Sequence, residues 1–485
     1  MNFLFHFPPR AVYSGREERQ MRGTSRKDFS VMDLARKRIT VMGLGLLGGG
    51  VGVARYLAQQ GAVVTVTDLK DADALADSVE KLDGFPVAFH LGGHLDADFT
   101  GADVVVVNPA VPDGSPFLAK AREAGVALET EINLFSKLCP AQIVGITGSN
   151  GKSTAASLTA HLLEAGPRRT WLGGNIGRSL LEELDAIEAD DLVVLELSSF
   201  QLERLAWTGL SPAVSVVLNL TPNHLDRHRT LDAYAAAKQP ILLNQRSTDA
   251  ALLNAECPLV SQWDGLGCGR KLFFSTQRPV GRGAWLDGDE ALWLDGGAPR
   301  TLFARSDLRL RGDHNLGNAL AAAGAAALCG VPVEEIGPRL ASFEPLEHRL
   351  EGVRTLDGVT YYNDSKATTP EAAIAAIRAF DEPVVLIAGG YDKHIPFGEL
   401  GKAVCEGVQK AILFGATAEK IRDAVEAAGG APTVMVADLP AAVLEAREAA
   451  QPGWVVLLSP ACASYDMFEN FEERGTLFKK LVMEL

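Results

Sequence analysis

The sequence lacks three features that mark membrane-spanning, secreted or nucleic-acid-binding proteins. No apolar run reaches the roughly 18 residues that a membrane-spanning helix needs. Its six cysteines include no CxxC pair, which argues against a disulfide framework or a zinc site and favours thiols in a reducing cytoplasm. Because 46 Lys and Arg residues face 61 Asp and Glu residues, the net charge is −15. We therefore expect a soluble cytoplasmic protein with no nucleic-acid or membrane partner.

The length and the pattern of strands and helices predict an α/β protein of three domains. A chain of 485 residues divides into roughly two to four domains, and 47% hydrophobic with 22% charged residues is ordinary globular composition. Apolar runs alternate with helical stretches along most of the chain, which is typical of parallel sheets. We predict a Rossmann-like N-terminal domain over residues 39–140, a P-loop ATPase-like central domain over residues 141–345 and a Rossmann-like C-terminal domain over residues 346–485.

The first 38 residues differ from the rest of the chain in charge. They carry nine Lys or Arg and four Asp or Glu residues, a net charge of +5, so the remaining 447 residues carry −20. This segment shows no hydrophobic periodicity, and its apolar start is too short for a signal-peptide core. We interpret it as a disordered basic tail, with Met32 as an alternative start of translation to Met1.

Short apolar runs bounded by turn residues define further expected elements. Residues 281–297 contain Gly-Asp-Gly and Asp-Gly-Gly turns between aromatic segments and predict an antiparallel hairpin. Residues 316–329 are rich in alanine and predict a helix. Strands of the third block are expected at 359–362, 384–388, 411–414, 433–436 and 455–458.

The first glycine-rich loop indicates a nucleotide site. A strand at 39–42 leads into Gly43-x-Gly45-x-x-Gly48, and Asp68 follows the next strand about twenty residues later. Such loops turn backbone N–H groups and a helix N-terminus toward a diphosphate. A tight turn packed on glycine is the alternative, and the motif does not distinguish NAD from another nucleotide diphosphate.

The second glycine-rich loop is the sharper signal. Its sequence, GITGSNGKST over residues 145–154, joins a strand to a helix. Small residues let the backbone approach phosphates, Lys152 supplies a cation, and Ser153 supplies a hydroxyl for Mg²⁺. The loop departs from the common G-x-x-x-x-G-K-[ST] form, because Ile146 stands five residues before Gly151. A chance glycine-rich turn is the weaker interpretation.

Two later strand ends carry candidate metal ligands. Glu196 ends the apolar strand at 192–195, and His224 follows the strand at 214–218. Ligands collect at the carboxyl edge of a parallel sheet, so both groups are expected beside the phosphate loop. Taken alone, Glu196 fits a solvated charge and His224 a capping or core residue.

Eight segments resemble, in order and spacing, the Mur ligases of bacterial cell-wall synthesis. They are GITGSNGKST, ELSSFQLE, LNLTPNHLDRH, GDHNLGNALAA, EHRLEGV, NDSKATTP, LIAGGYDKHIPF and LSPACASYDMFENFEERG. The resemblance runs from about Ile39 to the C-terminus, and ELSSFQLE and SPACAS resemble the family member that adds D-glutamate. Folylpolyglutamate synthases are similar through the TG-x-NGK loop but are not expected to carry the first glycine loop.

The resemblance implies a reaction and its partners. The activity would be ATP-dependent ligation of D-glutamate to UDP-N-acetylmuramoyl-L-alanine through an acyl phosphate, in peptidoglycan precursor synthesis. ATP and two Mg²⁺ ions would be required, and the protein would act as a monomer.

The resemblance also implies a role for each matching residue. ATP would be held by Gly148, Asn150, Gly151, Lys152, Ser153, Thr154, Asn318, Arg349 and Asp364. The UDP substrate would be held by Gly45, Leu46, Asp68, Asn175 and His224, and D-glutamate by Lys366, Thr368, Lys393, Ser464 and Phe471. The metal ions would be held by Ser153, Glu196, His224 and Lys238, and the catalytic residues would be Lys152, His224 and Lys238.

Lys238 has a special expectation, because it occupies the position that the family carbamylates with CO₂. Without the resemblance, a solvent-facing lysine on an alanine-rich helix would be the better interpretation. The sequence departs from the family around the uridine, with Asn108-Pro109-Ala110 in place of Ser-Pro-Gly and with apolar Leu47 and Leu69. Ser149 replaces the usual threonine of the phosphate loop.

Two other classes of protein remain as alternatives. A nicotinamide dehydrogenase would use the first glycine loop and Asp68 but would leave Lys152 and Glu196 without a role. A non-catalytic nucleotide sensor would tolerate loss of His224 and the SPACAS segment, and both are present.

Overall fold

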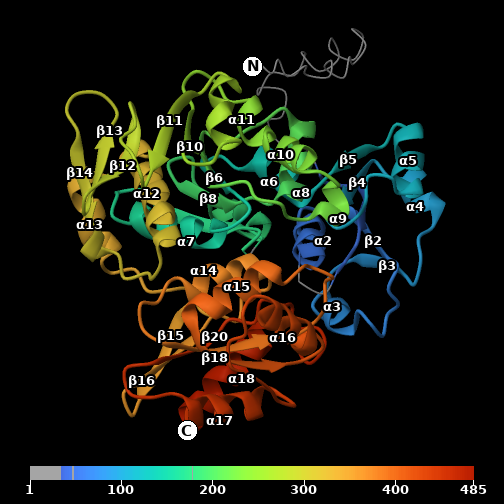
Figure 1. The fold of residues 1–485 in the computed structure, drawn as a ribbon. Coiled ribbons are helices and arrows are strands. Elements are labelled where there is room, and N and C mark those ends of the chain that lie inside the picture. The colour runs from blue at the N-terminus through green and yellow to red at the C-terminus, as the bar shows by residue number, and fades with distance from the viewer. Residues whose placement is uncertain (1–33, 46–48, 177–178) are drawn as a thin grey trace, which may run out of the picture.

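A computed structural model describes residues 34–45, 49–176 and 179–485, and its chain forms three sheets flanked by helices (Figure 1). Of the basic tail predicted over residues 1–38, residues 1–33 lie outside the described residues, as do Leu46 and Leu47. Residues 34–38 instead belong to the fold, because Leu34 is buried and Arg38 begins the first strand. None of the helices in the described part is both long and apolar enough to cross a membrane.

The first sheet is parallel throughout and has the strand order β3-β2-β1-β4-β5. Its strands are β1 (Arg38–Met42), β2 (Val63–Asp68), β3 (Val87–Leu91), β4 (Val104–Val107) and β5 (Ala127–Glu129). The accompanying helices are α2 (Gly49–Gln59), α3 (Ala76–Glu80), α4 (Asp96–Thr100), α5 (Pro116–Glu123) and α6 (Glu131–Leu138). The predicted strand–glycine loop–helix–strand unit is confirmed.

The second sheet has nine strands in the order β14-β13-β12-β11-β10-β9-β6-β8-β7. They are β6 (Gln142–Thr147), β7 (Thr170–Gly174), β8 (Leu192–Glu196), β9 (Val214–Val217), β10 (Ala250–Asn254), β11 (Arg270–Ser275), β12 (Gly283–Asp287), β13 (Glu290–Leu294) and β14 (Arg300–Ala304). Only β12–β13 and β13–β14 pair antiparallel, so the hairpin predicted over residues 281–297 is confirmed and lies at one end of a parallel sheet.

The helices around the second sheet include the alanine-rich helix expected from the sequence. They are α7 (Lys152–Leu163), α8 (Ser199–Leu205), α9 (Leu225–His228), α10 (Leu231–Lys238), α11 (Pro240–Leu243), α12 (Asp313–Leu328) and α13 (Val333–Leu340), with 3₁₀ turns η2 (Leu181–Ala186), η3 (Ala206–Thr208), η4 (Val260–Gly265) and η5 (Arg305–Asp307). Small side chains let α12 lie close to the sheet. A Cβ added to Gly324 would lie 2.7 Å from Cδ2 of Leu252.

The third sheet has the order β15-β16-β20-β17-β18-β19, and all its pairs are parallel except β15–β16. Its strands are β15 (Glu351–Leu356), β16 (Val359–Asn363), β17 (Val384–Gly389), β18 (Val408–Phe414), β19 (Thr433–Met435) and β20 (Val455–Leu458). The helices are α14 (Pro370–Ile377), α15 (Gly398–Gly407), α16 (Ala418–Ala427), α17 (Leu439–Ala449) and α18 (Phe471–Glu484). The three sheets confirm the predicted fold class, whereas the exact domain limits stay predictions.

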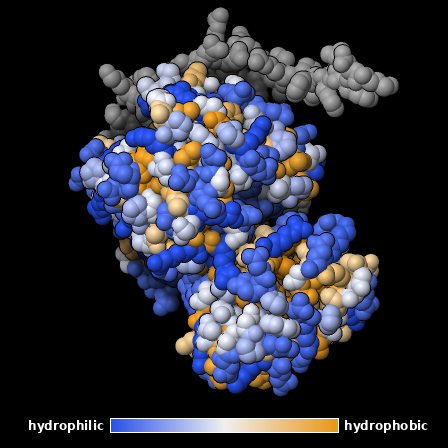
Figure 2. Space-filling model, turned by 60° about the vertical axis from the view of Figure 1, so that its left-hand side comes forward, coloured by the Kyte–Doolittle hydropathy of each residue, from blue (hydrophilic) through white to orange (hydrophobic). Residues whose placement is uncertain are grey.

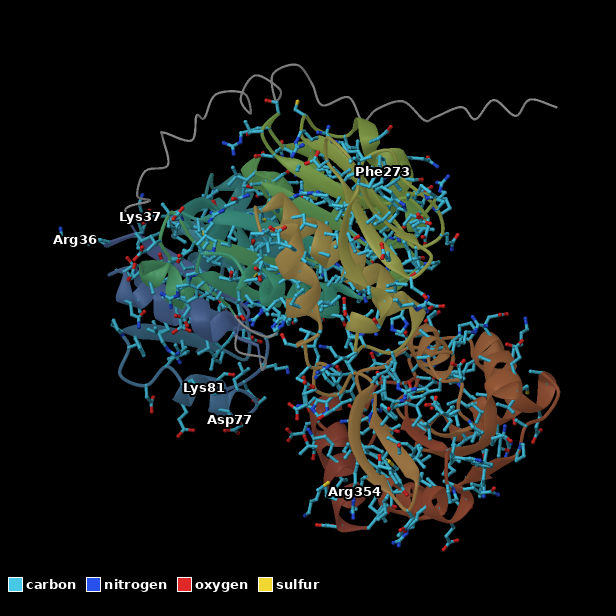
Figure 3. The ribbon with its side chains drawn as sticks, turned by 90° about the vertical axis from the view of Figure 1, so that its left-hand side faces the viewer. Arg36, Lys37, Asp77, Lys81, Phe273 and Arg354 are labelled. Carbon is cyan, nitrogen blue, oxygen red and sulfur yellow. The ribbon has the colours of Figure 1, made fainter. Side chains whose placement is uncertain are left out.

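The surface is hollowed between the third sheet and the rest of the molecule (Figure 2). Arg36 and Lys37 project outward where the described chain begins (Figure 3). Arg354 reaches from β15 to the end of α18, where its Nη1 donates to the carbonyls of Val482 at 3.2 Å and Met483 at 3.1 Å. A cation at this place favours the helix, because the carbonyl end of a helix carries partial negative charge.

Candidate active site

The phosphate loop joins β6 to α7 at the carboxyl edge of the second sheet. Gly151 has a φ of 82°, a left-handed conformation that glycine adopts without strain, and it is the N-cap of α7. The first residue of the helix, Lys152, donates its Nζ to the carbonyl of Ser149 at 2.9 Å. Burial is the main cause that lowers the pKa of Lys152, while the Glu196 carboxylate opposes this shift.

The loop after β9 holds the phosphate loop in place through hydrogen bonds. Asn219 Oδ1 accepts from the backbone N–H groups of Ser149 at 3.1 Å and Asn150 at 2.9 Å, and its Nδ2 donates to the carbonyl of Asn150 at 3.0 Å. The Ser149 hydroxyl donates to the carbonyl of Thr221 at 3.0 Å and accepts from its N–H at 2.9 Å. The serine that replaces the usual threonine therefore helps to shape the loop. Sequence reasoning did not single out Asn219 or Thr221, since each lies about 70 residues from its partner.

Asn318 of α12 lies directly on the glycine of the phosphate loop. A Cβ added to Gly151 would lie 2.3 Å from Oδ1 of Asn318, too close for any side chain. Asn318 donates in turn to Asn315 Oδ1 at 3.0 Å, and Asn315 donates to the carbonyl of Arg311 at 2.8 Å. Asn318, which is predicted to contact ATP, thus lies against Gly151, the residue that precedes Lys152 at the start of α7.

Glu196 is the last residue of β8 and is only 2% exposed, so the interpretation as a solvated charge is wrong. Its Oε1 accepts from Nδ2 of Asn175 at 2.9 Å, while its Oε2 is buried and has no hydrogen-bond partner among the described residues. The hydroxyl of Thr154, on the first turn of α7, is also buried without a partner there. An orphaned buried carboxylate oxygen is costly, and a divalent cation satisfies it. The donor set therefore fits Mg²⁺.

Lys238 is buried to 1% exposure, so the interpretation as a solvent-facing lysine is wrong. Its Nζ donates to Oγ1 of Thr147 and to the carbonyl of Gly148, both at 3.1 Å, and lies 4.8 Å from the centre of the Tyr234 ring. Burial and then the Lys152 charge lower the pKa of Lys238 well below its usual range, against the opposing Glu196. The end of α10 thus places an amine against the phosphate loop.

His224 and His228, at the two ends of α9, both contact the ring of Phe200. The His224 ring meets Phe200 edge-on at 5.0 Å and is exposed, whereas the buried His228 stacks on Phe200 at 5.3 Å. His228 also shares a 3.0 Å hydrogen bond with the hydroxyl of Ser199. His224 has a φ of 52° at the N-cap of α9. The core imidazole of this segment is therefore His228, and His224 is the one accessible to a ligand.

Cations from the third sheet come close to the phosphate loop. Arg349 and Lys366 both lower the pKa of Lys152 through their charges, and Glu196 raises the pKa of Lys366 against the larger effect of burial. Nε of Arg349 is buried and lacks a hydrogen-bond partner in the described part of the chain. Lys152 and Lys366, which are distant in sequence, thus both lie within electrostatic reach of Glu196, and Arg349 lies within reach of both lysines.

Asp364 lies beside this cluster, just after β16. Its Oδ2 accepts from the hydroxyl of Ser459 at 2.8 Å and its Oδ1 from the N–H of Leu350 at 3.2 Å. Burial nevertheless raises the pKa of Asp364 to about 7, because the hydrogen bonds and the Arg349 charge offset it only in part.

This raised pKa predicts a pH-dependent stability. Between about pH 4 and pH 7 the folded protein keeps a proton on Asp364 that the unfolded chain has released, so the free energy of unfolding falls as the pH rises through this window. The Asp364→Asn variant lacks this dependence. In urea unfolding without ligands, its stability relative to the parent should increase from about pH 5 to about pH 8. The exposed Asp381→Asn serves as the control, and a difference independent of pH would contradict the assignment.

Four of the five predicted D-glutamate residues lie in loops at the carboxyl edge of the third sheet, and the fifth, Phe471, is the first residue of α18. Lys366 Nζ lies 5.4 Å from the centre of the Phe471 ring, and Ser464 is buried. Thr368 is half-buried two residues after Lys366, and Lys393 is exposed on the loop after β17. The structure thus pairs Lys366 with Phe471 and leaves Lys393 at the surface.

Arg474 joins these loops through hydrogen bonds. The residue was not identified from the sequence. It is fully buried in α18, and its guanidinium donates to the carbonyls of Ser365, Cys462 and Ala463 and to the Ser365 hydroxyl, at 2.8–3.3 Å. The Ser365 hydroxyl donates to the carbonyl of Phe471 at 2.8 Å. Arg474 lies in FEERG, part of a segment that carries the family resemblance. Its hydrogen-bond partners, however, are about 10 and about 110 residues away, so the sequence did not indicate them.

The first glycine loop differs from the expected diphosphate cradle. The N–H groups of Leu44 and Gly45 donate to Oδ2 of Asp68 at 2.9 Å and 3.2 Å, and the N–H of Lys70 donates to its Oδ1 at 2.9 Å. The acid therefore closes the loop itself, and these N–H groups do not face a free space. Leu46, a predicted contact of the UDP substrate, lies outside the described residues.

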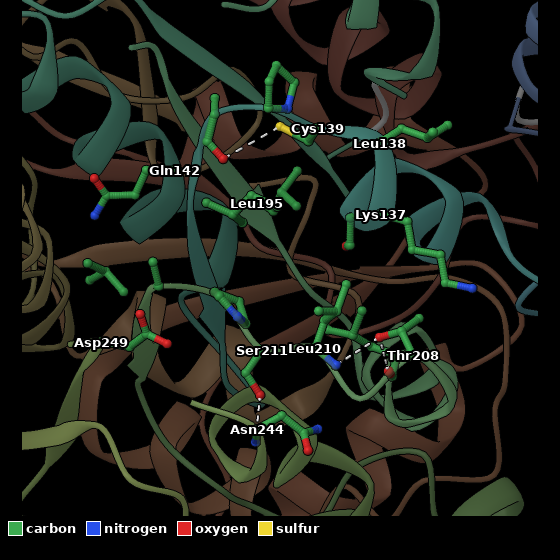
Figure 4. Close-up of a pocket in the computed structure, with 18 of the residues that line it drawn as sticks. Lys137, Leu138, Cys139, Gln142, Leu195, Thr208, Leu210, Ser211, Asn244 and Asp249 are labelled. Carbon is green, nitrogen blue, oxygen red and sulfur yellow. Dashed lines mark hydrogen bonds between the residues drawn. The ribbon is translucent and has the colours of Figure 1, made fainter. Parts of the chain in front are cut away.

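Two cavities accompany this arrangement. One, of about 1240 Å³, is lined by Gln142, Ser211 and Asp249 at the amino ends of β6, β9 and β10, on the edge of the sheet opposite to Lys152 (Figure 4). The other, of about 290 Å³, is lined by Thr154 and Asn315 from the central region and by Arg349 from the C-terminal region. The smaller cavity is therefore the one beside the phosphate loop.

A mostly parallel sheet with a phosphate loop, accompanied by two further α/β units of which the C-terminal one brings Arg349 and Lys366 close to the loop, is the arrangement of a nucleotide-dependent ligase. The chain belongs to the Mur ligase family. Family models match residues 37–129 (Mur ligase MurD-like, N-terminal domain), 146–326 (Mur ligase middle domain) and 348–462 (Mur ligase, glutamate ligase domain). Enzymes of this family use ATP and Mg²⁺.

Similar proteins cover nearly the whole chain. A UDP-N-acetylmuramoylalanine–D-glutamate ligase of Roseiflexus sp. is 46% identical over 93% of this chain and 99% of its own length. The protein of that name from Symbiobacterium thermophilum is 42% identical over 93% and 98%. The solved UDP-N-acetylmuramate–alanine ligase of Thermotoga maritima matches with a TM-score of 0.59 at 20% identity, over 92% and 99% of the two chains, which shows the shared fold.

Proposed function

We propose that the protein joins D-glutamate to UDP-N-acetylmuramoyl-L-alanine while converting ATP to ADP and phosphate, as a step of peptidoglycan precursor synthesis. The observation that carries this proposal is the phosphate loop with Lys152 at the start of α7, beside a buried Glu196 whose Oε2 has no hydrogen-bond partner among the described residues. The charges of Lys366 and Arg349 from the C-terminal region also reach Lys152. The names of the relatives that match the full chain support the choice of substrates. We further propose a cytoplasmic monomer.

The reaction needs charge neutralisation more than acid–base chemistry. The alanyl carboxylate attacks the γ-phosphate of ATP, ADP leaves, and an acyl phosphate forms. The amine of D-glutamate then attacks the acyl carbon, phosphate leaves, and the amine loses a proton as the amide forms. Both steps bring anions together, so Lys152 and the cations Arg349 and Lys366 stabilise the developing negative charge.

Two Mg²⁺ ions are part of the proposal. Ser153 and Glu196 would hold the first, because the orphaned Oε2 of Glu196 needs a cation. His224 and a carbamylated Lys238 would help to hold the second, with Asn175 orienting Glu196 through its 2.9 Å hydrogen bond. Bound Mg²⁺ supplies electrostatic stabilisation of the phosphoryl oxygens.

The remaining assignments follow the placement of the loops. The phosphates of ATP would lie on Gly148, Asn150 and Gly151, and the nucleoside would extend past Asn318 toward the 290 Å³ cavity. D-glutamate would be received by Lys366, Thr368, Lys393, Ser464 and Phe471. The UDP group would lie at the first glycine loop, with Asp68 shaping the loop through the N–H groups of Leu44 and Gly45.

One assay tests the function. Purified protein is expected to release ADP with UDP-N-acetylmuramoyl-L-alanine and D-glutamate, and much less with L-glutamate or L-lysine. The new amide is identified by mass spectrometry. Turnover of NAD with no ADP release would instead support the dehydrogenase alternative, and nucleotide binding without turnover would support the sensor.

The D-glutamate assignment predicts the effect of a single substitution. Lys393→Ala removes a cation from the loop after β17, and a charged hydrogen bond to a carboxylate contributes about 1.5–3 kcal/mol. The KM for D-glutamate should therefore rise about 10–100-fold while the KM for ATP stays within about twofold. Lys402→Ala, a surface lysine paired with Glu399, is the control. An unchanged requirement for D-glutamate would refute the role of Lys393.

A further inference from the structure

Two arginines of the central region hold a loop of the N-terminal sheet. This loop, residues 109–113, follows β4 and leads toward α5. The guanidinium of Arg204 donates to the carbonyl of Val111 at 2.8 Å and pairs with the carboxylate of Asp113 at 2.8 Å. Arg227 Nη1 donates to the carbonyl of Pro109 at 3.0 Å. Three groups of one short loop are therefore fixed by side chains more than 90 residues away.

Arg204 is built into the protein interior. Its side chain has no exposed surface, whereas its partner Asp113 is 49% exposed. The guanidinium lies 4.7 Å from the centre of the Trp207 ring, and the carbonyl of Arg204 accepts from Nδ2 of Asn133 in α6. Nε and Nη1 of Arg204 find no hydrogen-bond partner among the described residues. Such burial is costly for a cation, so an arginine whose cost is only partly offset suggests a role beyond stability.

Arg227 packs on Phe200, the aromatic ring that both histidines contact. Its guanidinium lies 4.4 Å from the centre of the Phe200 ring, which His224 meets edge-on at 5.0 Å. Arg227 follows His224 by three residues on α9, and Arg204 lies on α8, which starts three residues after Glu196. Each arginine therefore lies on the helix that directly follows one of the proposed metal ligands in the chain.

The residue before this loop contacts the first glycine loop. A Cβ added to Gly43 would lie 2.9 Å from Cβ of Asn108, and the Asn108 side chain bonds its own loop through Oδ1, which accepts from the N–H of Ala110 at 3.0 Å. A shift of residues 109–113 would therefore move Asn108 against Gly43. One continuous series of contacts joins the first glycine loop to the segments carrying Glu196 and His224.

We infer that Arg204 and Arg227 are positioning residues that fix residues 109–113, and thereby set the distance between the UDP-binding loop and the site where the alanyl carboxylate reacts. The inference rests on the proposed function. The substrate must span from one sheet to the other, so its fit depends on how the two are aligned. ATP and D-glutamate contact neither residues 109–113 nor the first glycine loop in this proposal, so their binding should not depend on the two arginines.

Steady-state kinetics of Arg204→Met and Arg227→Met test this role. Methionine keeps much of the apolar length of arginine and removes its donors and charge. Each variant should raise the KM for UDP-N-acetylmuramoyl-L-alanine about tenfold, and the double variant by more, with the KM values for ATP and D-glutamate within about twofold. Hydrogen exchange of the amides in residues 109–113 should become faster in the ligand-free variants. Arg270→Met, which removes a surface pair with Asp295, is the control.

The outcomes separate this inference from the proposed function. If the parent protein does not use the UDP substrate, the proposed function fails. If the parent is active and the variants keep the parental KM for that substrate, or raise all three KM values equally, the positioning role is wrong.

A second variant tests the Arg204–Asp113 contact in case Arg204→Met does not fold. Asp113→Asn removes the ion pair from its exposed side and leaves the buried arginine in place. It should raise the same KM, and its effect should be smaller when Arg204 is already methionine. Additive effects of the two substitutions would contradict a role through the Arg204–Asp113 contact.

Discussion

Replacing Lys238 by alanine is expected to lower ligase activity about 100–1000-fold, the usual cost of removing one preorganised group that stabilises charge in a reaction. Lys238 is buried against the phosphate loop, and burial together with the Lys152 charge lowers its pKa. The neutral amine is the form that adds to CO₂, giving a carbamate and releasing one proton. The carbamate would provide the oxygen ligands that Mg²⁺ prefers and would remove a cation from its surroundings.

Chemical rescue makes this prediction specific. A short carboxylate such as acetate should restore part of the activity of Lys238→Ala by occupying the vacated space. Lys410→Ala, which removes a lysine paired with Glu445, should stay active and show no response to acetate. A carbamate signal from ¹³C-labelled bicarbonate in the parent, absent from Lys238→Ala, would provide direct support. An unmodified amine in the fully active, substrate-bound enzyme would refute the proposal.

The second large effect is expected for Glu196→Gln. The substitution preserves the shape of the side chain, so β8 and the contact of Asn175 with Oε1 should survive. The orphaned Oε2, however, is replaced by an uncharged NH₂ group that cannot bind a metal ion. We expect kcat to fall about 100–1000-fold and the Mg²⁺ concentration for half-maximal activity to rise.

Nucleotide binding separates a metal defect from misfolding. Glu196→Gln should still bind ATP without Mg²⁺, measured by calorimetry, because Lys152 and the loop amides are unchanged. The exposed Glu188→Gln provides the control for a change of the same chemical type. Parental activity of Glu196→Gln at low Mg²⁺ would show that Glu196 holds no metal.

The spacing of residues in the sequence was enough to predict those parts of the site that lie within one strand and the turn or helix after it. The phosphate loop with Lys152 and Ser153, and Glu196 at a strand end, could be expected because backbone direction fixes where such residues point. The edge strand β15 was not expected, since it has few apolar residues to mark it and depends on pairing with β16.

The contacts missed by the sequence analysis join segments far apart in the chain. Asn219 contacts the phosphate loop, Arg474 joins the loops of the third sheet, and Arg204 holds residues 109–113. All three bond to backbone carbonyls or amides, and any polar side chain could make such a bond. Their role follows from where the folded chain places them, which local pattern does not encode. The resemblance to a family named candidate ligand-contacting residues, but it did not indicate these supporting residues.

The contact between Gly151 and Asn318 limits how this protein can change. A single added methyl group at position 151 would collide with the Asn318 side chain, so the close approach of Asn318 in α12 to the start of α7 requires glycine at this position. Through Asn315, the same helix is bonded to Arg311, whose guanidinium makes two 3.0 Å bonds to Glu382 beside the third sheet. Position 151 is therefore restricted to glycine while Asn318 faces it. A larger residue there would disturb the phosphate loop and, through Asn318, Asn315 and Arg311, the contacts with Glu382 as well.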